Sequence, residues 1–566
     1  MYLPLNYRGI SLLSCVGKIY SGILNNRLSF YLENLCLLSD EQNGFRKGRS
    51  SEDHVFVLNY IVKKRLNTGE STFVAFIDMA KAFDCVDRNL LLYKLLMNGI
   101  DGYFYKAIKC LLSNTISQVK VNNIYTDFFT TTSGFRQGYA LSPTLFSMFC
   151  NDLIVELNEL GLGIHVGGID ICSLVYADDI AIMADSEDKL QIMIDHIYQW
   201  CCKWRLKLNI DKSQVIHFRK KNVQQTDYMF KVCNANINIT AEYRYLGIIF
   251  DEFLNFNSCA ETLSKAASRA LGGVISKFKQ FKNVGFRTFS KLYQAAVVPV
   301  MDYCASVWGY RNTLQCTNIQ NNAVRYFLGV HKKAPIAGLQ GEVSWVTPSY
   351  RQYLIMVSLW NRFSKMSDTH LTKIIFRWDV GLCKNNWSSD IKKVLCDIER
   401  PQWFDPEGQF RLPLQEAEGC IVHLMNNVWK NDITVKPKLR TYVKIKNNCL
   451  AENYLDLNIT RHRRSLIAQI RLGILPLEIE VGRFRGIAVD QRLCKCCNNN
   501  VTENEFHFIC ICPQYQHLRD SLYGKFDFSH DVSDEDKFKR VMSTNFKCLV
   551  EYLDHAWNAR TNILYN

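Results

Sequence analysis

An acidic pair divides the apolar stretch Leu174-Val-Tyr-Ala-Asp-Asp-Ile-Ala-Ile-Met183 into two halves. Such halves predict a β-hairpin with Asp178 and Asp179 at its turn. Adjacent residues on an extended backbone point to opposite sides, so only one of the two can face a shared site squarely. We expect that residue to be Asp178, with Asp179 as an outer or alternating ligand. Hairpin turns also contain Asp for their turn chemistry, so the pair alone is compatible with a structural role.

A third carboxylate ends another apolar run. Phe73-Val-Ala-Phe-Ile-Asp78 is typical of a strand, and a helix is expected after it. A carboxylate at the end of a strand projects from a rigid base, although Asp78 could equally cap the following helix. Two acidic sites on neighbouring strands would together hold a pair of divalent ions about 3.5–4 Å apart, as phosphoryl transfer requires.

Between the two acidic sites lies a glycine-containing loop, Ser133-Gly-Phe-Arg-Gln-Gly-Tyr-Ala-Leu-Ser-Pro143. Gly134 and Gly138 allow the backbone to approach a base or sugar closely, and Arg136 and Gln137 bring polar side chains to the same place. The following residues predict an apolar helix whose start would face a polyanion.

These motifs occur in the order found in the reverse transcriptases of non-long-terminal-repeat (LINE-like) retrotransposons, which the sequence resembles. The resemblance covers the first 250 residues closely and continues more loosely to about residue 309. The matching motifs are Asn6-Tyr-Arg-Gly-Ile-Ser-Leu-Leu13, Gln42-Asn-Gly-Phe-Arg-Lys-Gly-Arg49, Phe76-Ile-Asp-Met-Ala-Lys-Ala-Phe83, Gly134-Phe-Arg-Gln-Gly138, Leu141-Ser-Pro143, Tyr176-Ala-Asp-Asp179, Asn209-Ile-Asp-Lys212 and Tyr245-Leu-Gly247.

The resemblance implies a role for each matched residue. Asp78, Asp178 and Asp179 would hold two Mg²⁺ ions, or Mn²⁺ in their place. Lys212 would be the general acid for the leaving pyrophosphate, and Phe83 would exclude a ribose 2′-hydroxyl. The remaining contacts would be Arg46 with Lys47 or Arg49 to the triphosphate, Gln137 and Gly138 to the incoming nucleotide, and Tyr245, Leu246 and Gly247 to the primer end. A solvated surface charge is the alternative for each basic residue.

Two features depart from the family pattern. Tyr139-Ala140 stand where the family usually has Cys-Pro, so the local loop is expected to differ. Met1 lies almost directly before the first motif, whereas family members normally have upstream polymerase sequence and often an endonuclease. We therefore keep open that the sequence is a fragment or a degenerate copy.

A cysteine cluster near the end of the chain has the spacing of a metal site. Cys494, Cys497, His507 and Cys512 give Cys-x2-Cys-x9-His-x4-Cys, which suits tetrahedral Zn²⁺ in a structural knuckle. Other ligand registers remain open, using Cys496, Cys510 or His517. Buried thiols beside an unrelated histidine are the alternative.

The composition limits the class of protein. The chain has 566 residues, 48% of them hydrophobic, with a net charge of +14, which favours a polyanionic partner. The sequence has no apolar run of 18 or more residues, so we predict no membrane span. The 22 scattered cysteines fit an intracellular, reducing location. Arg461-His-Arg-Arg464 is a candidate phosphate contact, with a solvated helix face as its alternative.

Together these patterns predict an α+β right-hand polymerase with a mostly helical C-terminal extension. The predicted divisions are fingers and palm over 1–250, a helical thumb and connection over 251–345, a helical extension over 346–485, a zinc knuckle over 486–530 and a tail over 531–566.

The expected function is RNA-directed DNA polymerase, with template RNA, DNA primer or target DNA and deoxynucleoside triphosphates as partners and no membrane. The resemblance implies that the protein acts in the nucleus and cytoplasm. A non-catalytic nucleic-acid-binding fragment is the rival class. Phe83 and the Ala-Asp-Asp form of the hairpin disfavour an RNA-dependent RNA polymerase.

Overall fold

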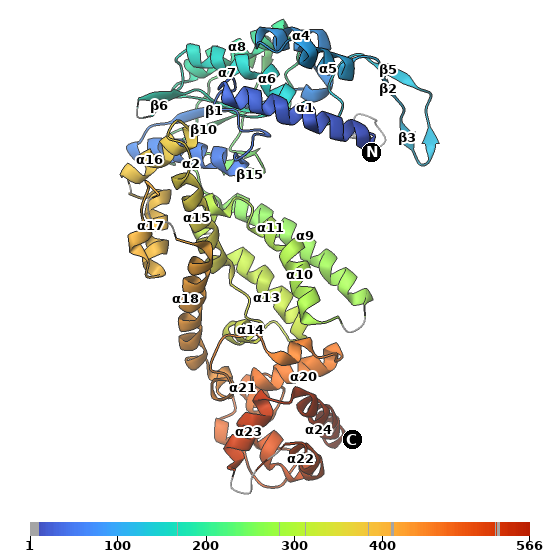
Figure 1. The fold of residues 1–566 in the computed structure, drawn as a ribbon. Coiled ribbons are helices and arrows are strands. Elements are labelled where there is room, and N and C mark those ends of the chain that lie inside the picture. The colour runs from blue at the N-terminus through green and yellow to red at the C-terminus, as the bar shows by residue number, and fades with distance from the viewer. Residues whose placement is uncertain are drawn as a thin grey trace. The chain divides into compact units, whose positions relative to one another are not determined.

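The computed structural model divides the chain into two compact units (Figure 1). Unit 1 consists of Met1–Cys259, Trp360–Ile391 and Asp405–Gln409, and unit 2 of Ala260–Leu359, Lys392–Phe404 and Phe410–Asn566. The structure describes residues 11–166, 168–281, 284–311, 313–382, 384–408, 412–526, 528 and 532–565. Residues 6–10 of the first motif, Asn6–Leu13, therefore lie outside the described residues.

Unit 1 combines helices with a five-stranded sheet, as predicted for an α+β fold. Its helices are α1 (Cys15–Asn34), α2 (Ser51–Thr68), α3 (Ala82–Cys85), α4 (Arg88–Met97), α5 (Gly102–Leu112), α6 (Leu141–Phe149), α7 (Asn151–Glu159), α8 (Glu187–Lys203) and α16 (Leu371–Leu382). Its strands are β1 (Thr72–Asp78), β2 (Thr115–Ser117), β3 (Lys120–Val121), β4 (Ile124–Tyr125), β5 (Phe129–Thr131), β6 (Ile164–Val166), β7 (Ile169–Ile171), β8 (Ser173–Tyr176), β9 (Asp179–Ala184), β10 (Gln214–Phe218), β11 (Lys231–Val232), β12 (Ala235–Asn236), β13 (Asn238–Ile239), β14 (Glu242–Tyr245) and β15 (Ile248–Asp251).

The main sheet has the strand order β13-β10-β1-β9-β8, with β1 at its centre. β1 pairs antiparallel with both β9 and β10. All of its residues except Asp78 are buried, because both faces of the strand are covered by other elements. The apolar sequence of β1 therefore forms the interior of the sheet and leaves its terminal carboxylate at the edge of the core.

The predicted hairpin around the acidic pair is confirmed as β8 and β9. Tyr176 pairs with Asp179, so the two-residue turn consists of Ala177 and Asp178. Ala177 has a φ of 58°, in the left-handed region that costs an L-residue roughly 1–2 kcal/mol. The turn therefore needs support from its surroundings.

The first described helix is α1, and the Ser14 side chain caps it by accepting from the Gly17 amide. Only the second half of its apolar stripe is buried, through Leu24, Leu28 and Leu32. Apolar residues in the first half, among them Val16 at 77% exposure, face solvent.

Residues 360–391 belong to unit 1, although we predicted them within a separate helical extension over 346–485. The fully buried Phe56 of α2 contacts Phe363 and Trp387, with ring centroids 4.7 and 5.3 Å apart. Arg362 also pairs at 2.6 Å with the buried Asp53. These contacts are between residues about 300 positions apart, so no local pattern could predict this return of the chain.

Unit 2 is helical, as predicted. The helices that lie in it wholly or in part are α9 (Asn257–Gln280), α10 (Phe286–Ala296), α11 (Val298–Met301), α12 (Ala305–Trp308), α13 (Leu314–Leu328), α14 (Ile336–Val343), α15 (Pro348–Ser364), α17 (Trp387–Asp397), α18 (Leu414–Thr434), α19 (Tyr442–Ile445), α20 (Arg461–Arg471), α21 (Glu478–Phe484), α22 (Gln516–Tyr523), α23 (Asp534–Ser543) and α24 (Phe546–Tyr565).

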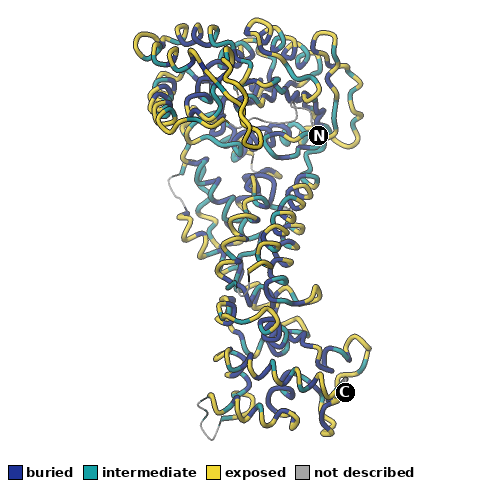
Figure 2. The backbone as a smooth tube through the Cα atoms, turned by 90° about the vertical axis from the view of Figure 1, so that its right-hand side faces the viewer, coloured by how far each residue is buried: buried dark blue, intermediate teal, exposed yellow. Residues whose placement is uncertain are grey.

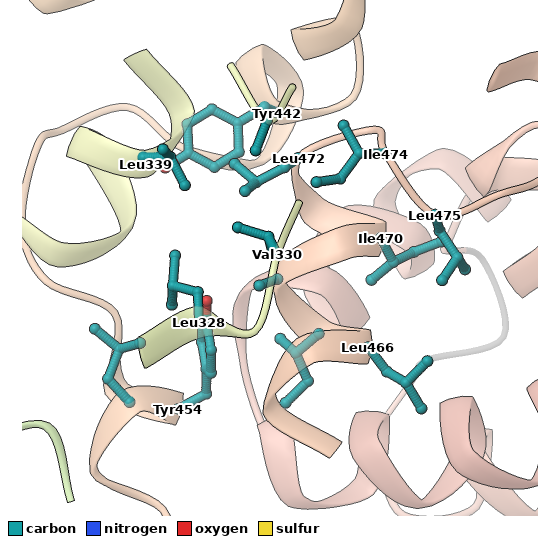
Figure 3. Close-up of a cluster of buried hydrophobic side chains, with 14 of the residues drawn as sticks. Leu328, Val330, Leu339, Tyr442, Tyr454, Leu466, Ile470, Leu472, Ile474 and Leu475 are labelled. Carbon is teal, nitrogen blue, oxygen red and sulfur yellow. The ribbon is translucent and has the colours of Figure 1, made fainter. Parts of the chain in front are cut away.

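One continuous core joins the elements of unit 2. Figure 3 shows part of this core, in which Leu328, Leu339 and Tyr442 lie near Leu466 of α20 and near Leu472, the residue that follows α20. The cysteine segment and α23 and α24 contribute to the same core. Residues of the predicted knuckle over 486–530 and tail over 531–566 share this core, and α24 packs against α20 and α22.

Buried residues line the interior of each unit, and exposed residues face outward (Figure 2). Among the described residues, no helix is both long and apolar enough to cross a membrane.

Candidate active site and metal centre

Two of the predicted carboxylates lie opposite each other where β1 and β9 run side by side; among the described residues, the oxygens of all three are not gathered within 4.8 Å of one another. Asp78 ends β1 and Asp179 begins β9, and the two are direct partners in the antiparallel register. Directly opposed residues of an antiparallel pair project to the same face. The register thus places Asp179 across from Asp78, and the expectation that Asp178 shares a metal with Asp78 stays a prediction. Asp178 is the neighbouring turn residue.

The carboxylates at this point of the sheet repel one another. Burial and the charges of Asp178 and Asp78 raise the pKa of Asp179 to about 6. Burial and the charges of Asp179 and Asp78 raise the pKa of Tyr243 to about 12. The ring of Tyr243 stacks on Phe76, with centroids 4.4 Å apart. Crowded carboxylates of this kind fit a divalent cation, which prefers oxygen ligands and would relieve the repulsion.

A loop after α8 holds Asp78 in place. The Asn209 side-chain amide donates to Asp78 Oδ2 at 2.9 Å, and the Asn209 backbone amide donates to the Asp78 carbonyl at 2.8 Å. The Ser213 hydroxyl accepts from the Asp78 backbone amide at 3.1 Å. We had singled out Lys212 of this segment, which is exposed, and had given Asn209 and Ser213 no role. The quoted motif Asn209-Ile-Asp-Lys212 contained the signal for Asn209.

The motif beginning at Gln42 packs directly against the hairpin turn. Gln42 Oε1 accepts from the Ala177 amide at 3.0 Å and from the Gly44 amide at 2.9 Å, and the Asn43 amide donates to the Val175 carbonyl at 3.0 Å. A Cβ atom on Gly44 would lie closer than 3.0 Å to the Ala177 nitrogen. Only glycine therefore permits this approach, and the contact supports the left-handed Ala177.

Phe83 lies in a group of aromatic rings, and one of them, Phe45, also contacts Tyr176, which ends β8. The Phe83 ring stacks on Phe146 with centroids 4.5 Å apart and meets Phe135 and Phe45 edge-on. Three neighbouring rings fix its orientation. A rigid aromatic side chain at this position can limit the space beside a bound sugar.

Of the three basic residues predicted to contact the triphosphate, two form ion pairs within the protein and one is exposed. Arg46 pairs with Glu33 at 2.7 Å, and its hydrogen bond lowers the pKa of that carboxyl. Arg49 pairs with Asp40. Lys47 between them is exposed. Both guanidinium groups thus brace the loop from within, and Lys47 is the cation that reaches solvent.

The glycine-containing loop lies against the segment after Asp78. Gln137 Nε2 donates to Asp84 Oδ1 at 3.0 Å. Gly134 and Gly138 have φ values of 73° and 90°, and a Cβ on Gly134 would lie 2.5 Å from the Asp84 carbonyl oxygen. Both glycines therefore adopt a backbone conformation that favours glycine, and Gly134 also lies close to the Asp84 backbone, whereas the approach to a base or sugar stays a prediction.

Tyr245 is buried beneath the sheet, and Leu246 and Gly247 form the turn between β14 and β15, with φ values of 46° and 85°. The Tyr245 hydroxyl donates to the Leu174 carbonyl at 3.3 Å and lies 3.3 Å from His54 Nδ1. Burial raises the pKa of Tyr245 and lowers that of His54 to about 3. Sequence analysis missed His54, which links α2 to this hairpin.

The four predicted Cys and His ligands form a candidate metal site. Cys494, Cys497, His507 and Cys512 are all buried, and their ligand atoms lie within 4.8 Å of one another. His507 Nε2 lies 3.5 Å from the Cys497 sulfur. Hydrogen bonds from the thiols of Cys496 and Cys512 lower the pKa of Cys494. Such a set of soft ligands with one imidazole suits a four-coordinate metal.

The alternative ligands fall into two groups. Cys496 lies with Cys494 and Glu503 in an overlapping candidate cluster. Cys510 and His517 are in neither cluster among the described residues, and His517 is exposed.

Beside this site is an ion pair that sequence analysis missed. Arg560 of α24 donates to both oxygens of Glu503, each at 2.8 Å, and both side chains are almost fully buried. Glu503 also accepts from the Glu478 amide at 2.7 Å. The partners are 57 positions apart, so their pairing left no local signal.

The predicted phosphate contact at the start of α20 is largely engaged within unit 2. Arg463 pairs with Asp554 at 2.9 Å, and Arg464 is buried and donates to the Phe327 carbonyl. Arg461, which lies over the ring of Tyr326, remains exposed.

Comparisons with known proteins agree on the first part of the chain. Residues 4–250 match the family described as reverse transcriptase (RNA-dependent DNA polymerase). The chain is 27% identical over 332 residues to the probable RNA-directed DNA polymerase from transposon BS of Drosophila melanogaster, covering 57% of this chain and 36% of that protein. It is 25% identical over 310 residues to the RNA-directed DNA polymerase from mobile element jockey of Drosophila funebris, covering 54% and 33%. The chain thus spans about a third of these relatives.

Among solved structures, telomerase from Candida albicans in complex with the TWJ fragment of telomeric RNA aligns at 11% identity with a TM-score of 0.35, covering 76% of this chain and 57% of that one. Apo telomerase from Candida tropicalis aligns at 12% identity with a TM-score of 0.32, covering 63% and 60%. The family match and the sequence relatives thus agree that residues 4–250 are similar to reverse transcriptase domains.

Proposed function

We propose that this chain is the polymerase part of a non-long-terminal-repeat retrotransposon protein, an RNA-directed DNA polymerase that supports RNA-mediated transposition. The observation that carries the proposal is the pairing of Asp78 with Asp179 across neighbouring strands, with Asp178 beside them, inside the segment that matches the family. Template RNA, a DNA primer or target DNA and deoxynucleoside triphosphates are the proposed partners, and the nucleus and cytoplasm the proposed compartments.

Asp78, Asp178 and Asp179 would hold two Mg²⁺ ions, or Mn²⁺ in their place. When bound, such ions stabilise charge on the attacking and leaving oxygens. The chain's own contribution is positioning: the amide of Asn209 fixes the Asp78 carboxylate, and the contact with Gln42 fixes the turn that carries Asp178.

The incoming deoxynucleotide would lie beside Phe83, whose packed ring leaves no freedom to accommodate a 2′-hydroxyl. Gln137 and Gly138 would support the nucleotide from the loop. Lys47 is the simplest triphosphate contact because it is exposed, whereas Arg46 and Arg49 would have to exchange their carboxylate partners.

At the primer end, Leu246 and Gly247 would contact the strand while the buried Tyr245 anchors their turn. Lys212 is exposed and would donate a proton to the leaving pyrophosphate.

The cluster of Cys494, Cys497, His507 and Cys512 would hold a structural Zn²⁺. Four buried protein ligands leave no open position for catalysis, so the metal would stabilise unit 2 and help it to grip nucleic acid.

Primer extension tests this proposal. The purified chain is given a poly-rA template, an oligo-dT primer and Mg²⁺, and the metal is then chelated. Asp178→Asn and Asp179→Asn should abolish DNA synthesis, whereas Asp185→Asn, the same change at an exposed residue just after β9, should preserve it. A folded, RNA-binding chain that makes no DNA would contradict the proposal and favour a non-catalytic binding fragment.

A further inference from the structure

A cavity of about 410 Å³ opens in unit 1, and none of the residues proposed for catalysis lines it. Its walls come from α2, from the end of α16, from residues 384–386 and from the start of α17, all within unit 1. Volumes of this size are typical of sites for small molecules.

The inner wall of the cavity is aromatic and contains a hydroxyl group without a partner. Phe56, Tyr60 and Trp387 line it, and each is at most 4% exposed. The Tyr60 hydroxyl is buried and has no hydrogen-bond partner among the described residues. A buried hydroxyl left in this state costs free energy, which a ligand able to hydrogen-bond to it would recover.

Hydrogen-bond acceptors accompany these rings. Asp379 lines the cavity at 1% exposure, and its Oδ2 accepts from the Ser388 amide at 2.7 Å and from the Ser388 hydroxyl. Asn59 and Asn386, both nearly buried, add side-chain amides. Flat rings together with acceptors suit a planar heterocycle that carries N–H donors.

The outer part of the cavity carries positive charge. Lys384 and Asn67 are exposed, and Lys64 is half-buried with its ammonium group 5.6 Å from the ring centroid of Trp378. Ammonium groups at an open mouth suit phosphate oxygens. A ligand that meets both ends therefore has a heteroaromatic base at one end and a phosphate at the other.

We propose that this cavity binds one nucleotide unit, with its base against Tyr60 and Trp387 and its phosphate at Lys64 and Lys384. The unit can come from a free nucleotide or from an unstacked position of a single strand. Such a site is separate from the polymerase carboxylates and adds a second nucleotide contact to unit 1.

Calorimetric titration of the full chain without divalent cations tests the proposal. The probes are adenosine monophosphate, adenosine, inorganic phosphate and a ten-residue oligo-rA. Adenosine monophosphate should bind at least about tenfold more tightly than adenosine or phosphate alone, because only it meets both ends of the cavity. Competition by oligo-rA for the same site identifies the strand as a source, and its absence identifies the free nucleotide.

Variants assign the binding to the cavity. Tyr60→Phe should weaken the binding of adenosine monophosphate about three- to tenfold, which is the range for the loss of one hydrogen bond, without lowering the unfolding temperature. Lys64→Glu with Lys384→Glu should weaken it by about tenfold or more. Lys109→Glu, at an exposed residue of α5, and Asp178→Asn serve as controls and should leave it unchanged.

Primer extension by Tyr60→Phe should continue at the wild-type rate. A loss of binding at the cavity can then be told apart from a loss of polymerase activity. The proposal is overturned if neither adenosine monophosphate nor oligo-rA binds, or if the cavity variants bind both as tightly as the wild type does.

Discussion

The close approach of Gly44 to the hairpin turn makes Gly44→Ala a sharp test of how the active site is held. A methyl group at this position would lie closer than 3.0 Å to the backbone nitrogen of Ala177. The methyl group would also meet the backbone carbonyl carbon of Tyr176 and Gln42 Oε1, each at 3.0 Å, and the two backbone atoms cannot rotate away from it. The Gln42 motif and the turn must therefore separate by roughly 1 Å to reach ordinary contact.

Separation on that scale acts on the two hydrogen bonds that join the motif to the hairpin, from Asn43 to Val175 and from Ala177 to Gln42. Each is worth about 0.5–1.5 kcal/mol net, so unit 1 should lose roughly 1–3 kcal/mol of stability. A misplacement of about 1 Å at Asp178 should lower kcat for primer extension by on the order of 100-fold.

Gly22→Ala is the matched control, because no atom lies within 4 Å of the added methyl and the position is inside α1. Alanine there should leave activity unchanged and stabilise the helix by up to about 1 kcal/mol. Single-turnover primer extension and urea unfolding measure both effects. If Gly44→Ala extends primers at the wild-type rate with unchanged stability, the reasoning about this contact is wrong.

Three further changes probe the supports of the two sites. Asn209→Ala removes the amide from Asp78 Oδ2 and should lower kcat about tenfold at unchanged stability, measured by primer extension; equal activity would show that the amide does not position the carboxylate. Arg560→Met leaves Glu503 buried and unpaired and should cost unit 2 about 3–5 kcal/mol in urea unfolding, a loss that Arg560→Lys should partly restore. Cys497→Ser should reduce bound zinc to well below one ion per chain by atomic absorption, and chelation of the wild type should lower its unfolding temperature, whereas a metal-free wild type of equal stability would refute a structural metal.

Local patterns were enough to predict the elements that carry the active site. The two apolar halves around the acidic pair predicted β8 and β9, and the apolar run before Asp78 predicted β1. The spacing from Cys494 to Cys512 likewise predicted which four side chains gather. In each case the information lies within about 20 residues of sequence.

The same patterns could not give the register, in which Asp179 is the strand partner of Asp78. The face to which each side chain of a strand points can be assigned only when the position of the turn is known. The turn here consists of Ala177 and Asp178, which makes Asp179 the first residue of β9. The pairing of Arg46 with Glu33 was equally hidden, because it depends on how α1 packs beside the following loop.

The return of residues 360–391 to unit 1 has a consequence for attempts to isolate the polymerase. A polypeptide ending near residue 259 would keep every motif of the family match and yet lose Arg362, Phe363 and Trp387. Asp53 would then be left without its cation, and Phe56 would face water. The smallest independently folding form of unit 1 is therefore expected to be discontinuous in sequence, so that a two-piece complementation or a shortened bridge across 260–359 would succeed where simple deletion fails.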